Sequence, residues 1–202
     1  MRFWKPRHVP GHPLVTVVAA AYAPSSRLQH ACLAFVHCML GQTYQNIELL
    51  LMHDGPMKDE LKRWLPRDSR LHLIENEFRL NQHGHPQRVH GISVSKGAYI
   101  GLANADCWYV PVYIEWLVSE LIRHKADIAF CDMIHSHHLW RPFETKFKKS
   151  MLDVGAWIAR GDLVRSTPWT DYGFSGDGTF IDAMAAKANK TTKVKAFLYT
   201  HN

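Results

Sequence analysis

The chain has 202 residues, of which 47% are hydrophobic and 21% charged, so it is long enough and apolar enough to fold around a sizeable core. Its 24 basic and 18 acidic residues leave a formal net charge of +6, which either favours anionic partners (phosphates, nucleic acid, an acidic membrane surface) or simply makes the surface basic. No apolar stretch approaches the roughly 18 residues that span a bilayer, which excludes a transmembrane segment on sequence pattern.

Cysteine usage points to a reducing compartment. Cys32, Cys38, Cys107 and Cys131 lie in apolar stretches and form no C-x-x-C pair, so we expect reduced core residues rather than a zinc cluster. Residues 1–13 lack the apolar core of a signal peptide and are expected to form an irregular arm. The sequence therefore predicts a cytoplasmic protein.

Hydrophobic periodicity predicts alternating strands and helices over the first two thirds of the chain. Residues 14–22 form a near-continuous apolar run, which is typical of a strand covered on both faces. Apolar positions in residues 25–42 recur at spacings of three and four, as in a helix. The alternation continues with strand 47–55, helix 56–65, strand 70–76, helix 86–97 ending at Gly97, strand 98–104, helix 111–125 and strand 127–135.

The pattern loosens after residue 135. Residues 140–151 are expected to form an antiparallel edge segment, residues 176–189 a helix, and residues 193–202 a last strand. The whole series predicts an α/β fold with a mostly parallel, Rossmann-like sheet, helices on both faces and a small antiparallel C-terminal portion. A single domain is expected over residues 1–202.

Polar residues stand where the predicted parallel strands end. In open α/β sheets, ligands bind outside these carboxyl ends, which are Ala20–Tyr22, His53–Gly55 and Asn104–Asp106. Asp106 can hold a divalent cation, because Mg²⁺ and Mn²⁺ prefer oxygen ligands, or it can act only as a helix cap. Asp54 can accept hydrogen bonds from a base or ribose, or only shape a turn with the glycine that follows it.

Two further charged residues also allow both a structural and a chemical interpretation. Arg88 could meet a diphosphate through its planar guanidinium, or it could be a solvated helix residue. Asp177 lies between two glycines at the start of a predicted helix, where it could act as a general base or as a cap. Taken singly, each residue favours the structural interpretation, so only their combination carries information.

Taken together and in order, these motifs resemble the family 2 glycosyltransferases, which have the GT-A fold. The stretches "VTVVAAAY" and "GQTYQNIELLLMHDG" resemble the family's opening strand and its Q-T-Y-x-N-x-E and D-D-G patterns. "QRVHGISVSKGAYI" and "NADCWYVP" resemble its A-R-N-x-G-I segment and its D-x-D metal motif. "LDVGAWIARGDLV", "SGDGTFIDAM" and "LYTHN" resemble the acceptor-side segment, the stretch with the catalytic carboxylate, and a histidine near the metal. The resemblance covers residues 14–201 and implies a nucleotide-sugar-binding half (about 14–110) and an acceptor-binding half (about 111–202).

The resemblance implies an inverting transfer of a hexosyl or deoxyhexosyl group from a nucleoside-diphosphate sugar to a glycan or other hydroxyl acceptor. A divalent cation, Mn²⁺ or Mg²⁺, would stabilise the leaving diphosphate as a Lewis acid. The implied roles are Asp177 as the catalytic base; Ala20, Tyr22, Asp54, Arg88, Asn104 and Ala105 as donor-binding residues; Asp106 and His201 as metal ligands; and Asp153 and Trp157 as acceptor-binding residues.

Three positions depart from the family's pattern. Asn104 stands where the family usually has the first aspartate of its metal motif, and one fewer negative charge is expected to weaken metal affinity. His53 replaces the first aspartate of the D-D-G pattern, and Val89 replaces the asparagine beside Arg88. The Arg88 contact is therefore the least secure of the implied donor contacts.

Other classes of protein remain as alternatives. Asn104 would be the signature of a nucleotide-sugar-binding protein that is weakly active or inactive, although Asp106 and Asp177 argue against it. A nucleotidyltransferase would carry a glycine-rich, basic loop where this chain has "AAYAPSSR". A nucleic-acid binder is suggested only by the net charge, because no nucleic-acid motif is present. The histidines of "HSHH" (135–138) have no evident cysteine or carboxylate partner in the sequence, so they are expected to line the acceptor cleft or a loop rather than bind zinc.

Overall fold

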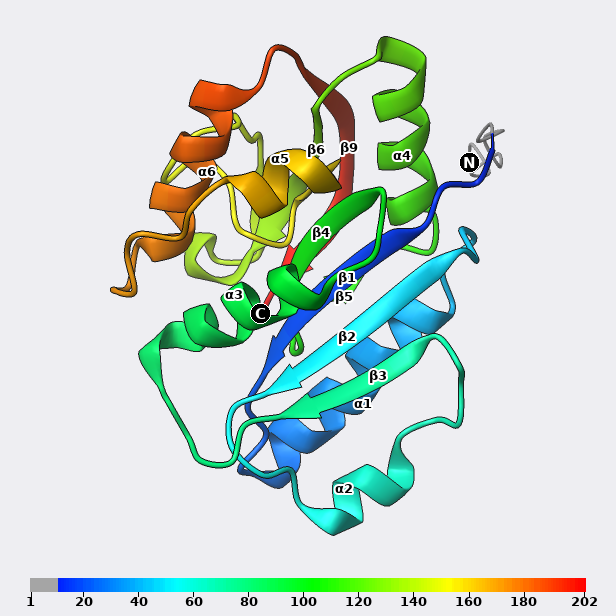
Figure 1. Ribbon diagram of the computed structural model, residues 1–202, viewed down its shortest axis with the longest axis vertical. Helices are drawn as coiled ribbons and strands as arrows, with labels where there is room; N and C mark the ends of the chain where they lie inside the picture. The colour runs from blue at the N-terminus through cyan, green and yellow to red at the C-terminus, as the bar shows by residue number, and fades with distance from the viewer. Residues whose placement is uncertain (1–10) are drawn as a thin grey trace.

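A computed structural model describes residues 11–202, in which one sheet holds nine strands (Figure 1). The strands are β1 (Val15–Ala21), β2 (Ile47–His53), β3 (Leu71–Glu75), β4 (Tyr99–Asn104), β5 (Trp108–Tyr109), β6 (Ile128–His135), β7 (Arg141–Phe143), β8 (Trp157–Arg160) and β9 (Thr191–His201). The α-helices are α1 (Ser26–Leu40), α2 (Asp59–Trp64), α3 (His85–Val94), α4 (Tyr113–His124), α5 (Gly161–Ser166) and α6 (Gly176–Lys187), with 3-10 turns η1 (Gln82–Gly84) and η2 (Ser136–His138).

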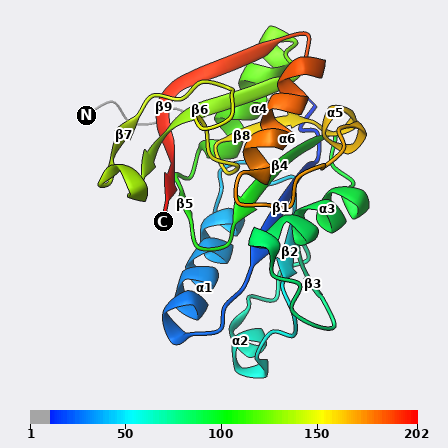
Figure 2. The same cartoon turned by 90° about the vertical axis from the view of Figure 1, so that its left-hand side faces the viewer.

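The first half of the sheet is parallel, as the sequence predicts. Strand β1 pairs in parallel with both β2 and β4, and β2 pairs in parallel with β3. Every residue of β2 is buried, which is why its sequence is a nearly unbroken apolar run. Helices α1 and α3 lie on opposite sides of these strands (Figure 2). The carboxyl ends of β1, β2 and β4 therefore open onto one common edge.

The second half of the sheet is mixed, and its centre contains a strand that periodicity did not reveal. The strand order is β3-β2-β1-β4-β8-β6-β9-β5, with β7 paired to β6. Strand β8 runs antiparallel to both of its neighbours, β4 and β6. It is four residues long, too short to show a period of two. The expected antiparallel edge segment is confirmed only over Arg141–Phe143, which forms β7.

Helix α3 ends at Val94, three residues before the predicted stop at Gly97. The need for glycine at 97 comes from close packing against β1 rather than from a helix cap. A Cβ atom on Gly97 would lie 2.5 Å from the Thr16 backbone nitrogen. The Gly97 N–H donates to Thr16 Oγ1 at 2.8 Å, and that hydroxyl donates to Glu48 Oε2 at 2.6 Å. A buried polar chain thus fixes the start of β4 against β1 and β2.

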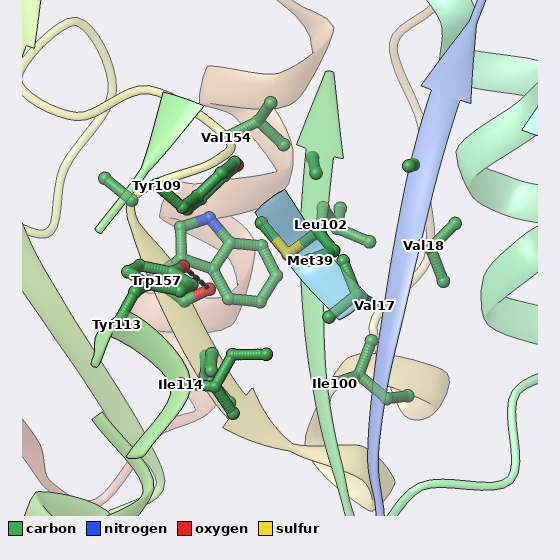
Figure 3. Packing of buried hydrophobic residues seen from close by; sticks show 14 of the residues in the cluster. Val17, Val18, Met39, Ile100, Leu102, Tyr109, Tyr113, Ile114, Val154 and Trp157 are labelled. Atoms are coloured by element: carbon green, nitrogen blue, oxygen red, sulfur yellow. Dashed lines mark hydrogen bonds between the residues drawn. The ribbon is translucent and has the colours of Figure 1, made fainter. Parts of the chain in front are cut away.

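The core contradicts one site prediction, because Trp157 is fully buried and cannot bind an acceptor. Its ring lies among Tyr109, Tyr113 and Ile114 in the centre of the molecule (Figure 3). The Tyr113 hydroxyl donates to the Trp157 carbonyl at 3.2 Å, which holds β8 against α4. The resemblance implied an acceptor-binding role for Trp157, but its place in a central strand makes it a packing residue.

Residues 1–10 of the predicted N-terminal arm lie outside the described residues, so that prediction is not tested. All four cysteines are free thiols; Cys38 is half-buried and the other three are buried. Within residues 11–202, no helix is both long and apolar enough to span a membrane.

Candidate functional site

A cavity of about 320 Å³ opens at the carboxyl ends of β1, β2 and β4. It is lined by every residue that the sequence assigned to the donor and to the metal: Ala20, Tyr22, Asp54, Arg88, Asn104, Ala105, Asp106 and His201. The Ala105 N–H donates to the Ala20 carbonyl at 2.9 Å, so the ends of β1 and β4 are joined directly. We refer to this space as the first cavity. Residues that are far apart in the sequence thus meet at the carboxyl ends of the parallel strands. This is where the strand-end rule, that ligands bind outside these ends, predicts a site.

Asp54 is buried and holds a loop in place beside the first cavity. Its Oδ1 atom accepts from the Leu80 N–H at 2.7 Å and from Gln87 Nε2 at 2.6 Å. Its Oδ2 atom accepts from the Asn81 N–H at 2.9 Å. The carboxylate therefore has a structural task that the sequence did not reveal, while contact with a base stays a prediction.

This tether leads to a first expected result. Asp54→Asn should lower the free energy of unfolding by about 1.5–3 kcal/mol, because an amide offers only one acceptor oxygen for the three donors that the carboxylate now accepts from. Urea denaturation measures the change. Asp59→Asn is the matched control, since the Asp59 side chain is 93% exposed and its loss should have almost no effect. Equal stability of the two variants would contradict the tether.

The loop that Asp54 holds has an unusual backbone. Residues 81–84 all have positive φ, between 57° and 75°, although only the last of them is glycine. A Cβ atom at Gly84 would lie 2.9 Å from the Ala20 side chain, so glycine is required where the loop meets β1. The loop thereby forms one wall of the first cavity through Asn81, His83 and Gly84. Apart from the lone glycine, no pattern in the sequence indicated this wall.

Arg88 is a buried cation that connects α3 with β4. One guanidinium nitrogen donates to the His83 carbonyl at 2.8 Å and lies 3.1 Å from His85 Nδ1. The other donates to the Asn104 side-chain oxygen. The Arg88 Nε atom is buried without a hydrogen-bond partner in residues 11–202. Asn104 therefore serves as a neutral acceptor for Arg88, a role that an aspartate would fill with an added charge.

A second cavity, of about 330 Å³, adjoins the first. The two share four lining residues: His83, Arg88, Asn104 and His201. The second cavity adds both carboxylates that were predicted from the C-terminal half, Asp153 and Asp177. It also includes His135, His137 and His138, as expected for the "HSHH" segment. The arrangement is thus two adjoining chambers with one cation, Arg88, at their junction.

Asp177 is a half-buried carboxyl group whose pKa is raised. It lies in the first turn of α6, where its Oδ1 atom accepts from the Gly178 N–H at 2.7 Å. Burial raises the pKa of its carboxyl group, and the Asp153 charge adds to the increase, while Arg88 opposes it. Burial likewise lowers the pKa of Arg88, and Asp177 and Asp153 oppose that shift. The three groups form one electrostatic unit across the junction.

His85, which the sequence analysis missed, contacts Arg88 and the loop before Asp177. Its Nε2 atom donates to the Gly173 carbonyl at 2.9 Å, and its Nδ1 atom faces Arg88. Burial lowers the pKa of His85 to about 4, and the Arg88 charge adds to the decrease. The imidazole is therefore neutral at pH 7 and can donate on one side while accepting on the other. It ties α3 to the loop that leads into Asp177.

His201 stands at the junction beside a second histidine and a carboxylate. Its Nε2 atom lies 3.7 Å from Asp153 Oδ2, and its ring stacks on His135 at 4.2 Å between centroids. One potential ligand atom from each of His135, Asp153 and His201 lies within 4.8 Å of the others. The carboxylate partner that the sequence did not reveal for "HSHH" is therefore Asp153. The pairing of β6 with β9 places His135 opposite His201.

Asp106 is the more available carboxylate on the first-cavity side. Within residues 11–202, its side chain has one polar contact, from Cys107 Sγ at 3.6 Å. Asp153, by contrast, already accepts from the Tyr199 hydroxyl at 2.5 Å and from the Gly155 N–H at 2.9 Å. An oxygen-preferring cation would therefore find unused ligand atoms on Asp106 and an imidazole on His201.

Comparison with known proteins shows which family and which proteins this sequence resembles. The family model described as "Glycosyl transferase family 2" matches residues 27–182. Two glycosyltransferases of Streptococcus pneumoniae are similar in sequence: GlyG is 31% identical over 57% of this chain and 38% of its own length, and GlyA is 29% identical over 57% of this chain and 16% of its own. This chain therefore matches well under half of either relative.

Solved structures agree on the fold. Residues 1–349 of TarS from S. aureus superimpose with a TM-score of 0.72 at 11% identity, covering 94% of this chain and 60% of that one. The same TarS fragment in complex with UDP-GlcNAc gives a TM-score of 0.71 at 12% identity, covering 93% of this chain and 58% of that one. The likeness establishes the GT-A architecture that the sequence predicted.

Proposed function

Because the chain belongs to glycosyl transferase family 2, we propose that it transfers a hexosyl or deoxyhexosyl group from a nucleoside-diphosphate sugar to an acceptor hydroxyl. The observation that carries this proposal is the pair of cavities that meet at Arg88, Asn104 and His201. The donor would occupy the first cavity and the acceptor the second. The complex of a structural neighbour with UDP-GlcNAc supports a nucleotide-sugar donor.

The donor's parts are assigned by the chemistry of the first cavity. Its nucleoside end would lie against Tyr22 and Asp54 at the ends of β1 and β2. Arg79, which stacks on the Tyr22 ring with its guanidinium carbon 3.9 Å from the centroid, adds a cation at that end. Arg88 would face the diphosphate at the junction, where a buried guanidinium stabilises the charge that develops on the leaving group.

The acceptor would react from the opposite side of the junction. Its hydroxyl oxygen forms the new bond to the anomeric carbon as the bond from that carbon to the diphosphate oxygen breaks. Asp177 would take the hydroxyl proton, and its raised pKa suits a group that must hold this proton. Because Asp177 lines the second cavity while the donor fills the first, attack comes from the face opposite the leaving group, which inverts the anomeric configuration.

A divalent cation, Mn²⁺ or Mg²⁺, is the proposed cofactor. It would be held by Asp106, whose carboxylate has one polar contact within residues 11–202, and by His201, which lines the same cavity. When bound, the cation would neutralise negative charge on the leaving diphosphate. Asn104 contributes no charge to this site and instead orients Arg88. The cation and the Arg88 guanidinium would therefore both compensate the negative charge of the leaving diphosphate.

A thermal-shift panel of nucleotide sugars, with Mn²⁺ or with chelator, tests the proposal. A donor at about a hundred times its Kd is expected to raise the Tm by about 5–10 °C with Mn²⁺. Asp106→Ala should remove the Mn²⁺-dependent part of the shift, whereas Asp59→Ala should retain it. The same panel is then assayed for slow hydrolysis of the donor. Binding without hydrolysis or transfer would identify a nucleotide-sugar-binding protein instead, and the absence of any shift in the folded protein would refute the assignment.

A further inference from the structure

The loop between β6 and β7 presents two large apolar side chains to solvent. Leu139 is 76% exposed and Trp140 is 53% exposed. The loop is well defined by its own hydrogen bonds: the Leu139 N–H donates to the Ser136 carbonyl at 3.0 Å, and the Trp140 N–H donates to the His135 carbonyl at 3.1 Å. The two side chains are thus held outward by a folded turn.

The residue types in this turn are costly for folding. Leu139 and Trp140 have φ values of 55° and 57°, in the left-handed region that glycine and asparagine occupy most readily. Only packing against neighbouring residues would offset the strain of a bulky side chain in this conformation. These two side chains remain exposed, so they gain no such packing energy. A turn that served only to join β6 and β7 would be more stable with Asn-Gly. The side chains therefore have a use outside the fold itself.

Three exposed cations follow the two apolar residues in the sequence. Arg141, Lys146 and Lys148 are exposed, and none of them forms an ion pair within residues 11–202. Between residues 139 and 149 there are four basic residues and one acidic residue, which gives a local charge of 4 − 1 = +3. The segment combines an apolar tip with a cationic base.

A third exposed apolar side chain, Phe174, lines the second cavity. Phe174, in the loop that leads into α6, is 80% exposed and touches the His83 ring edge-on at 5.7 Å between centroids. Phe174 and His138, the neighbour of Leu139, both line that cavity. Phe174 therefore lines the second cavity directly, whereas Leu139 and Trp140 follow His138, which also lines it.

We propose that these residues form a docking surface for an anionic lipid bilayer. The docking surface consists of Leu139, Trp140 and Phe174, which enter the interface, and Arg141, Lys146 and Lys148, which meet the headgroups. Tryptophan and leucine bury apolar area at the headgroup boundary, and each nearby lysine or arginine adds attraction to anionic lipid. An apolar tip followed in the chain by exposed cations complements such a bilayer better than it complements a neutral protein surface.

The docking surface has a consequence for the acceptor. With the surface on a bilayer, the second cavity opens toward the lipid, which fits an acceptor hydroxyl carried by a membrane-anchored molecule. This consequence rests on the proposed function, whereas vesicle binding itself needs neither donor nor turnover. Failure of one is therefore distinguishable from failure of the other.

Co-sedimentation with vesicles tests the proposal. The full chain is expected to sediment with vesicles of equal parts phosphatidylcholine and phosphatidylglycerol, less with added NaCl, and little with phosphatidylcholine alone. The paired change Leu139→Asn with Trp140→Gly should weaken vesicle binding by about tenfold or more while raising the Tm by about 2–4 °C. A gain in stability with a loss of binding cannot come from misfolding.

Two matched controls sharpen the test. Trp64→Ala removes a tryptophan of similar exposure, 51%, on α2 and should bind vesicles like the wild type. Lys146→Glu with Lys148→Glu should weaken binding by about tenfold or more, whereas Arg63→Glu with Arg67→Glu, an equal change of charge beside α2, should have a far smaller effect. No binding by the wild type, or unchanged binding by the Asn-Gly variant, would overturn the proposal. So would a wild-type dimer that the Asn-Gly variant converts to a monomer, because a second copy would then cover the surface.

Discussion

Asp177→Asn is expected to reduce the rate of glycosyl transfer by about 10²–10⁴-fold while leaving donor binding intact. The amide matches the carboxylate in shape and can keep the hydrogen bond from the Gly178 N–H, but it cannot take the acceptor's proton. Asp177 lines the second cavity and not the first, so the donor's thermal shift should be unchanged. Steady-state kinetics with the donor identified by the thermal-shift panel measures the loss.

The pH dependence of Asp177 has a defined sign. Burial raises the pKa of its carboxyl group, so kcat/KM should fall, as the pH is lowered, at a higher pH than an ordinary aspartate would give. For a carboxyl group whose pKa is raised in the folded state, the stabilising contribution is present at low pH and is lost as the pH rises through that raised pKa. The ionised Asp177 therefore costs stability at neutral pH, and Asp177→Asn should raise the Tm there.

Asp182→Asn is the matched control for both readouts, because Asp182 lies on the same helix and is exposed. It should keep full activity and show no pH-dependent gain in Tm. Full activity of Asp177→Asn would exclude this residue as the base. A lower Tm of that variant at neutral pH would contradict the sign of the shift.

Arg88→Lys is expected to lower kcat by about 10²–10³-fold with a smaller change in KM. Lysine keeps the charge, but it has no planar fork that reaches the His83 carbonyl and Asn104 together. The lysine ammonium group would form only some of these hydrogen bonds, and they would hold it away from the position of the guanidinium. The negative charge that develops on the diphosphate would then be less well stabilised. The split between kcat and KM separates loss of leaving-group stabilisation from simple loss of binding.

Arg160→Lys provides the comparison for Arg88. Arg160 also makes several polar contacts, with Asp127 and Asp162, but it lines neither cavity. Its change should leave kcat as it is. If Arg88→Lys also retained full kcat, charge compensation at the junction would have to come from elsewhere.

Local patterns accounted for much of the fold and for the outline of the site. Strand and helix periodicity predicted the parallel half because each of its elements buries a continuous face. The strand-end rule then selected Asp54, Asn104 and Asp106, which the structure places around one cavity. The short antiparallel strand β8 was not predicted, because four residues are too few to show a period. Trp157 belongs to this strand and is buried in the core, so it cannot line the acceptor site.

The sequence by itself determined the order of elements, the parallel half of the sheet and the residue types available at the strand ends, because these depend on neighbours a few positions apart. Only the tertiary structure decided which of these residues meet. His85 reaches Gly173 across 88 positions, and His135, Asp153 and His201 converge from three separate segments. Such contacts depend on how β6, β8 and β9 pair, and pairing is a property of the whole sheet. The burial that raises the pKa of Asp177 arises in the same way, from chain segments packed around it rather than from its own helix.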